Sequence, residues 1–305
     1  MPRRKTAGWL AVLLVLTLLC LCACGEEGSI RLLEPTPEPT APPPTLEPMP
    51  QRPEEESVRV YCDGLLTDRG YYRDETVFLD PALLCGELGL PLENTADEER
   101  FCVQIGELSV TGDAGTGYFL AGERYLFAPH GWLTVDGRAW LPADALARIF
   151  GVEISCAEDP LRAEILTLGA QLMDGSGLYY LDRCSDTEFY WLVHVIAAEA
   201  GNQPLAGQLG VGNVVMNRVE SEIFPNSIQE VVFQDNGGAA FSPVGSGEIH
   251  MVSDELSLIA AYLVLEGYNN VGESLYFVNP NVGNASWVTA NRTFVVRIGD
   301  HDFYA

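Results

Sequence analysis

Lysine is almost absent from this chain, because Lys5 is the only one among 305 residues. This excludes mechanisms that need a lysine side chain, such as the P-loop ammonium, the pyridoxal Schiff base and the Ser-x-x-Lys hydrolases. Basic residues are scarce altogether, with 17 Lys and Arg against 43 Asp and Glu and a formal net charge of −26. Phosphate backbones and anionic headgroups repel so acidic a surface, so we expect no nucleic-acid partner and no electrostatic docking to membranes.

Metal-binding motifs are also lacking. The four histidines include no His-Glu-x-x-His pair, so a zinc amidase built on His194, His250 and His301 is not favoured. The cysteines after residue 24 are odd in number and have no metal-ligand spacing, which favours buried free thiols over disulfides. These are Cys62, Cys85, Cys102, Cys156 and Cys184. We expect neither a metal nor another cofactor.

Residues 1–24 have the layout of an export signal. Three basic residues precede a short apolar run, which ends in Leu21-Cys22-Ala23-Cys24. This ending resembles a bacterial lipobox, which implies that Cys24 carries a diacylglycerol thioether; the alternative is an uncleaved N-terminal anchor. Both place the rest of the chain outside the cytoplasm. We therefore expect an extracytoplasmic protein anchored to the outer face of the cytoplasmic membrane and facing the cell wall.

Residues 25–56 differ sharply in composition from the rest of the chain. Nine of the 19 prolines fall between Pro35 and Pro53, spaced by Thr and Glu. Such a stretch cannot bury enough apolar area to fold, which predicts a disordered tether. At about 3 Å per residue it would reach up to about 90 Å from a lipid anchor.

Residues 57–169 contain a pattern that occurs twice, at Asp74–Leu79 and again at Asp136–Leu141. Each copy predicts a turn, a strand, a short helix opened by a proline (Pro81 or Pro142), a glycine stop and a second strand. Two copies predict a small α+β module. The second copy, through Gly151, resembles the repeat module named after the N-terminal domain of copper amine oxidases, without implying copper here. Whether this module binds wall material or spaces the next domain stays open.

Within residues 180–305, the run Phe189–Ala200 is apolar on nearly every face, which predicts a buried central helix. Glu199 lies in its last turn, on the same stripe as Val195 and Trp191. Desolvation and the negative end of the helix dipole both favour the neutral carboxyl, which suits a general acid for glycosidic cleavage. The alternative is a partly exposed residue at a helix end with no role in chemistry.

A second helix is predicted from Leu205 to about Glu220. Its glycines, Gly207, Gly210 and Gly212, predict the close approach of another backbone, in the first place that of the Glu199 helix. Asn213 and Asn217 share a face of this helix, and Gln208 lies within reach of it. Amides there suit sugar hydroxyls and acetamido groups, although a solvated face explains them nearly as well.

The segment Ala198–Val219 resembles the signature of the bacterial cell-wall hydrolases related to the spore cortex-lytic enzyme SleB. Further matches cover almost all of residues 190–305: Phe224–Ile228, Val231–Gln234, Phe241–Val244, Tyr276–Pro280 and Val295–His301. The resemblance implies a mainly helical, lysozyme-like catalytic domain in which Glu199 is the catalytic acid acting on peptidoglycan glycan strands. The predicted fold class is thus α+β, a small α+β repeat module followed by this domain.

The chain departs from the commonest form of that motif, Glu-Ala-Arg-Gly-Glu. Gly201 stands in place of the arginine and Gln203 in place of the second glutamate. Glu199 is therefore the only carboxylate in this turn, and no arginine of the turn is available to the substrate.

Two reactions stay open. In the lytic route, which we favour, Glu199 protonates the leaving oxygen and then, as a base, helps the muramic acid C6 hydroxyl attack C1. In the hydrolytic route, Asp235 or Glu248 activates water. A hypothesis of another class is a catalytically inactive surface lipoprotein that binds peptidoglycan. The substrate-binding candidates are Gln208, Asn217, Phe241, Ser242, Tyr276, Asn279 and Trp287.

Overall fold

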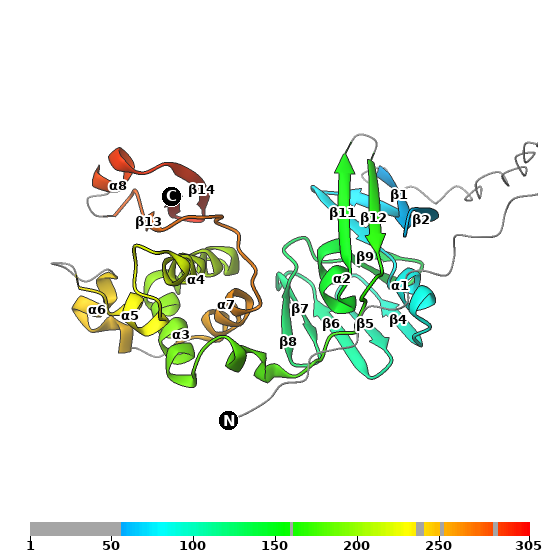
Figure 1. Ribbon diagram of the computed structural model, residues 1–305, viewed down its shortest axis with the longest axis horizontal. Helices are drawn as coiled ribbons and strands as arrows, with labels where there is room; N and C mark the ends of the chain where they lie inside the picture. Colours follow the sequence, from blue (N-terminus) through cyan, green and yellow to red (C-terminus); the bar gives the residue numbers. More distant parts are fainter. Residues whose placement is uncertain (1–55, 159–160, 236–240, 251–252, 283–285) are drawn as a thin grey trace, which may run out of the picture. The chain divides into compact units, whose positions relative to one another are not determined.

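The computed structural model describes residues 56–158, 161–235, 241–250, 253–282 and 286–305 (Figure 1). The predicted export signal, Cys24 and nearly all of the predicted tether lie outside these residues. The two largest hydrophobic cores lie in the β-rich half, residues 56–166, and in the helical half, residues 177–305. In the part of the chain that is described, no helix has the length and apolar character needed to cross a membrane.

Two sheets build the β-rich half. The first has the order β11-β12-β1-β2-β3-β10-β9; β1 and β12 pair in parallel, and the other neighbours pair antiparallel. The second is an antiparallel meander of β4 to β8 in chain order. The strands are β1 (Glu56–Cys62), β2 (Leu65–Arg73), β3 (Thr76–Leu79), β4 (Leu92–Ala96), β5 (Arg100–Ile105), β6 (Leu108–Asp113), β7 (Tyr118–Ala121), β8 (Arg124–Phe127), β9 (Leu133–Val135), β10 (Arg138–Pro142), β11 (Glu153–Glu158) and β12 (Leu161–Leu166).

Both copies of the repeat contain the elements that the sequence predicts. In the first copy β3 leads through α1 (Pro81–Leu88) to β4, and in the second β10 leads through α2 (Ala143–Phe150) to β11. Each helix stops at a glycine in the left-handed conformation, Gly89 with φ 65° and Gly151 with φ 59°, whose N–H closes the last turn. The meander between the copies was not predicted, so this half contains more strands than the small α+β module expected from the repeat.

The cysteines of the described part are all free thiols. Cys62, Cys85 and Cys184 are buried, as expected, whereas Cys102 and Cys156 are exposed on strands of the β-rich half. Burial raises the pKa of the Cys85 thiol to about 11, so this group is a packing element rather than a nucleophile.

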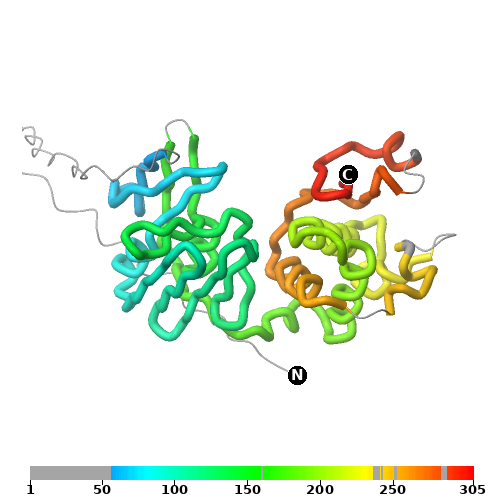
Figure 2. The backbone as a smooth tube through the Cα atoms, turned by 180° about the vertical axis from the view of Figure 1, so that it is seen from behind, coloured from blue at the N-terminus to red at the C-terminus, as the bar shows by residue number. Residues whose placement is uncertain are grey.

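The second half is mainly helical, as predicted. Its helices are α3 (Asp186–Ala200), α4 (Leu205–Glu220), α5 (Ile228–Val232), α6 (Ser242–Ser246), α7 (Glu255–Leu265) and α8 (Ser286–Asn291), with 3-10 turns η1 (Gly177–Asp182) and η2 (Glu248–His250). A three-stranded sheet of β13 (Tyr276–Val278), β14 (Phe294–Ile298) and β15 (His301–Tyr304) has β15 in the middle. β13 and β14 lie beside α4 (Figure 2).

The two long helices match the sequence prediction closely. α3 begins three residues earlier than predicted, because Ser185 and Glu188 form a capping box that satisfies the first amides. α4 has the predicted bounds, with Pro204 preceding its first turn. Both helices are buried along much of their length and pack on α7.

The glycines of α4 make room for side chains rather than for a backbone, which corrects the prediction. A Cβ atom on Gly212 would lie 2.7 Å from Cγ2 of Val264 in α7 and 2.8 Å from Cδ1 of Ile196 in α3. A Cβ atom on Gly210 would lie 2.7 Å from Cζ of Phe303 in β15. These glycines therefore let three different elements pack on one helix.

We expect Gly212→Ala to lower the free energy of unfolding by about 1–3 kcal/mol, because overpacking outweighs the better helix propensity of alanine. Gly86→Ala in α1 is the matched control: the added Cβ would have no described atom within 4 Å apart from its chain neighbours and the backbone of its own helix, so stability should hold or rise by up to about 1 kcal/mol. Urea unfolding of both variants measures the difference. Equal effects of the two substitutions would contradict the packing argument.

Candidate active site

Glu199 lies in the last turn of α3 and is half-buried. On the same stripe of the helix, Val195 is fully buried and Trp191 partly buried. α3 ends at Ala200, and the N–H of the C-cap residue Gly201 donates to the carbonyl of Ala197. The carboxyl therefore stands at the edge of an apolar core, at the negative end of the helix dipole.

Arg218, near the end of α4, places a buried cation in this region. Its side chain is enclosed by the rings of Phe224, Phe241 and Tyr276, whose centroids lie 5.1, 4.8 and 5.7 Å from Cζ. Nε donates to the carbonyl of Leu275 at 2.8 Å, whereas Nη1 is buried and has no hydrogen-bond partner among the residues that the structure describes.

The charge of Arg218 is coupled to that of Glu199. Burial lowers the pKa of Arg218 to about 10, while Coulombic interactions with Tyr276 and Glu199 act in the opposite direction. A buried guanidinium costs free energy unless it interacts with negative charge. Sequence reasoning missed Arg218 as a site residue, although the Asn-Arg pair belongs to the segment that resembles the cell-wall hydrolases.

Tyr276, Trp287 and Arg292 form a surface of aromatic and cationic groups. Nη2 of Arg292 donates to the hydroxyl of Tyr276 at 2.9 Å, and its Cζ lies 4.5 and 5.1 Å from the ring centroids of Tyr276 and Trp287. Trp287 is 57% exposed, so its face is open to a ligand. The structure thus brings two predicted residues together and adds a second arginine that the sequence analysis did not nominate.

Three other candidates take different positions. Phe241 is buried and packs on Arg218 and Phe277, so it supports the site through these contacts and is not exposed to a ligand. Ser242 opens α6, and the described part of the chain does not include its side chain. Asn279 follows β13, and its Oδ1 accepts a hydrogen bond from the N–H of Asn281, which fixes the turn there.

The predicted amides of α4 have protein partners. Gln208 is fully buried; it donates to the carbonyl of Gln203 and accepts from Oγ of Ser257. Asn217 donates to the carbonyls of Gly272 and Ser274. Gln208 therefore joins the turn before α4 to α7, and Asn217 joins α4 to the connection after α7. Neither therefore enters the site proposed below.

Gln203 fastens the turn after α3 to the C-terminal hairpin. Its Oε1 accepts from the N–H of Asp300 at 2.9 Å, and its Nε2 donates to Oδ2 of Asp300 at 3.1 Å and to Oδ1 of Asn202 at 3.0 Å. Gly299 has φ 58°, in the left-handed region that favours glycine, and a Cβ atom there would meet Oε1 of Gln203. The amide suits this position because it donates to one atom of Asp300 and accepts from another.

The carboxylates considered for water activation lie on other elements. Asp235 follows α5 and is exposed, and Glu248 begins η2, where it accepts from Oγ of Ser246. His194 is an internal packing residue, since Nδ1 is bonded to the carbonyl of Ile249 and its ring lies on Tyr190. Among the residues that the structure describes, no three His, Cys, Asp or Glu side chains cluster as metal ligands would.

The second half of the chain is similar in sequence to known proteins. Residues 202–304 match the family model described as Cell Wall Hydrolase. Over 119 residues, or 39% of the chain, the sequence is 32% identical to the spore cortex-lytic enzymes of Bacillus subtilis strain 168 and of Halalkalibacterium halodurans. The matches cover 38% and 35% of those proteins, so the chain spans less than half the length of these relatives.

A solved structure titled as the catalytic domain of the germination-specific lytic transglycosylase SleB from Bacillus anthracis shares 29% identity with the chain. The match covers 40% of this chain and 97% of that one, with a TM-score of 0.37. The sequence likenesses confirm the predicted resemblance of the C-terminal region to cell-wall hydrolases. Glu199 lies just before the segment that matches the family model.

We expect Gln203→Glu to make stability depend on pH, because it places two carboxylates within hydrogen-bond distance. Sharing a proton raises the pKa of one of them above its unfolded value, so the stabilisation is present at low pH and is lost as the pH rises through that pKa. Near neutral pH the loss should reach about 2–4 kcal/mol.

Thermal unfolding from pH 4 to 8 measures this, with Gln203→Glu combined with Asp300→Asn as the matched control, which restores a donor–acceptor pair. A single variant that is as stable as wild type at every pH would contradict the assigned hydrogen bonds.

Proposed function

We propose that the chain is a peptidoglycan-lytic enzyme whose active site is built around Glu199 by α3, α4 and the C-terminal sheet. The likeness of residues 202–304 to cell-wall hydrolases and the identity to enzymes named for spore cortex lysis support this proposal. The observation that carries it is the placement of Glu199 at the end of a buried helix, with its charge coupled to the buried Arg218.

Glu199 acts first as an acid and then as a base. The protonated carboxyl donates its proton to the glycosidic oxygen as the bond to C1 of muramic acid breaks. The resulting carboxylate takes the proton of the C6 hydroxyl, whose oxygen bonds to C1 and closes a 1,6-anhydro ring. This route uses one carboxylate and no water, in keeping with a turn in which Gly201 and Gln203 leave Glu199 as the only acidic side chain.

Arg218 and the aromatic surface serve the same reaction. The guanidinium, held in apolar surroundings by three rings, stabilises the carboxylate that forms when Glu199 has given up its proton. The exposed ring of Trp287 stacks on a sugar face, and Arg292 with Tyr276 offers donors to the oxygens of the glycan. The arginine contacts absent from the Gly201 turn thus come from α4 and from the segment after α8.

The same proposal includes the location of the enzyme. Lipidation at Cys24 anchors the mature chain to the outer face of the cytoplasmic membrane, and the proline-rich tether, residues 25–56, gives it reach into the wall. This part rests on the sequence pattern Leu21-Cys22-Ala23-Cys24 and on the composition of the tether.

We expect Glu199→Gln to reduce muropeptide release by about 10²–10⁴-fold, because the amide keeps the size of the side chain but cannot supply the proton. The assay incubates the full chain with purified sacculi and analyses the soluble products by mass spectrometry. Wild-type products should carry muramic ends lighter by one water than hydrolysed ends.

The matched control is Glu222→Gln, an exposed glutamate on the loop after α4, which should leave release unchanged. Full activity of Glu199→Gln would remove Glu199 from the mechanism. Hydrated reducing ends would assign the base to Asp235 or Glu248. Wild-type binding to sacculi without release would favour the non-catalytic surface lipoprotein.

For the anchor, we expect Cys24→Ala to abolish incorporation of labelled lipid and to release the protein from the membrane fraction. Cys22→Ala serves as the control and should retain the label, because the lipobox pattern ends at Cys24. Lipid labelling that persists in Cys24→Ala would contradict the assignment.

A further inference from the structure

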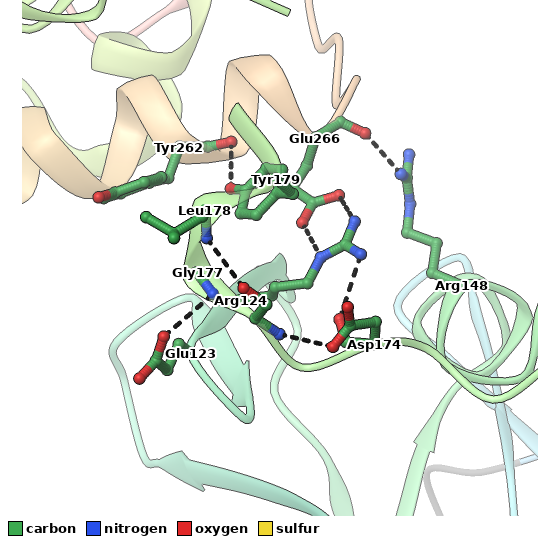
Figure 3. Close-up of polar contacts among 10 residues, drawn as sticks. Glu123, Arg124, Arg148, Asp174, Gly177, Leu178, Tyr179, Tyr262 and Glu266 are labelled. Carbon is green, nitrogen blue, oxygen red and sulfur yellow. Dashed lines mark hydrogen bonds and ion pairs between the residues drawn. The ribbon is translucent and has the colours of Figure 1, made fainter. Parts of the chain in front are cut away.

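The end of α7 is covered by residues of the β-rich half (Figure 3). Glu266 caps this helix, and its carboxylate is 4% exposed. Arg124, the first residue of β8, forms a bidentate pair with it, with Nε–Oε1 2.5 Å and Nη2–Oε2 2.6 Å. This pairing raises the pKa of Arg124 further. A two-point ion pair with so little exposure is a fixed contact rather than a surface charge pair.

A second arginine of the β-rich half lies at the same helix end. Nη1 of Arg148, from α2, donates to the main-chain carbonyl of Glu266 at 2.8 Å, and its guanidinium lies 3.8 Å from the ring centroid of Tyr268. The last carbonyls of a helix lack intrahelical donors and carry the negative end of its dipole. Arg148 therefore supplies a donor to the carbonyl of Glu266, while Arg124 neutralises the carboxylate of the same residue.

Aromatic rings extend the contact along α7. Tyr125 of β8 stacks on Tyr262 at 5.5 Å between centroids, and Phe127 lies edge-on to Tyr268 at 6.0 Å. Tyr179 donates from its hydroxyl to the carbonyl of Tyr262 at 2.9 Å, and Arg124 lies over its ring at 4.5 Å (Figure 3). Side chains of β7 and β8 thus pack against the core of the helical half.

The connection between the halves is itself bonded to the β-rich half. Gln171 and Met173 donate from their main chains to carbonyls of α2, and the N–H of Glu123 donates to the carbonyl of Gly175 at 2.7 Å. Gly122, with φ 63°, crosses Gly175 so closely that a Cβ atom on Gly122 would lie 2.6 Å from that carbonyl oxygen. Residues 167–176 are therefore bound to the β-rich half by main-chain hydrogen bonds and do not form a free hinge.

From these contacts we propose that the β-rich half is a structural part of the catalytic unit, joined to α7 by a junction centred on Arg124 and Glu266, and not a separately folding wall-binding module. The sequence alone predicts that residues 180–305 fold independently of the repeat module, because each segment has its own apolar pattern and the two meet near the Gly- and Ser-containing residues 174–177. The aromatic residues of β7 and β8, which could serve as sugar-stacking platforms on an isolated module, are used in the junction. Because α7 packs on α3 and α4, the junction supports the helix that carries Glu199.

The test is Arg124→Met in the full chain, followed by calorimetry and by chymotrypsin cleavage between residues 167 and 176. Wild type should unfold in one transition. The variant leaves the Glu266 carboxylate buried without its partner, so its Tm should fall by on the order of 5–10 °C and cleavage of the connection should become about tenfold faster or more.

Arg297→Met is the matched control, because Arg297 forms a bidentate pair with Asp302 that lies wholly inside the helical half. It should leave cleavage of the connection unchanged. Glu266→Gln keeps the shape of the junction and serves if Arg124→Met fails to fold; its cleavage rate should lie between those of wild type and Arg124→Met.

The charge-reversed pair, Arg124→Glu with Glu266→Arg, should recover part of the lost Tm. Separate transitions for the two halves in wild type, or unchanged cleavage in both Arg124→Met and Glu266→Gln, would overturn the proposal. Neither the unfolding transition nor the cleavage of the connection depends on peptidoglycan cleavage. The outcome of this test is therefore independent of the proposed function.

Discussion

The helical half depends on the burial of α4, which is packed on several sides at once. Its glycines admit Ile196, Val264 and Phe303 from three elements, and its amides bind the loops around α7. A helix so enclosed keeps little surface for solvent, and its one arginine, Arg218, stays inside among rings. The proposed chemistry of Glu199 uses this constraint, since a cation kept out of water acts strongly on a nearby carboxylate.

Burial of α4 also explains which parts of the site the sequence could predict. The position of Glu199 in the last turn of a buried helix followed from local information, because an apolar run that ends in one acidic residue before a glycine can be recognised along the chain. The helices of the two repeat copies, α1 and α2, were also predictable from local information, because each begins at or just after a proline and ends at a glycine. The hydrogen-bond partners of Gln208 and Asn217 could not be predicted from the sequence. The helical spacing of an amide is the same whether the amide binds a sugar or the carbonyl of a distant loop.

Tertiary contacts decided the remaining differences. Arg218 and Arg292 come together with Tyr276 only when α4, β13 and the segment after α8 are placed side by side, at sequence separations that no periodicity reports. Gln203 was interpreted as a missing glutamate, whereas in the structure its amide is matched to both groups of Asp300. The connection at residues 174–177 has the small residues of a flexible linker, but those glycines allow two backbones to cross closely. Composition alone cannot separate these two uses of glycine.

The parallel pairing of β1 with β12 has a mechanical consequence. The chain enters the β-rich half at β1 and leaves it after β12, and these neighbouring strands are paired from Arg59 with Arg162 to Cys62 with Ile165. In the proposed enzyme, a pull on the segment before β1, opposed by a helical half bound to a glycan, would draw the two strands past each other along their length. The hydrogen bonds between β1 and β12 would then bear the load together rather than one after another, so the β-rich half would resist unfolding under tension.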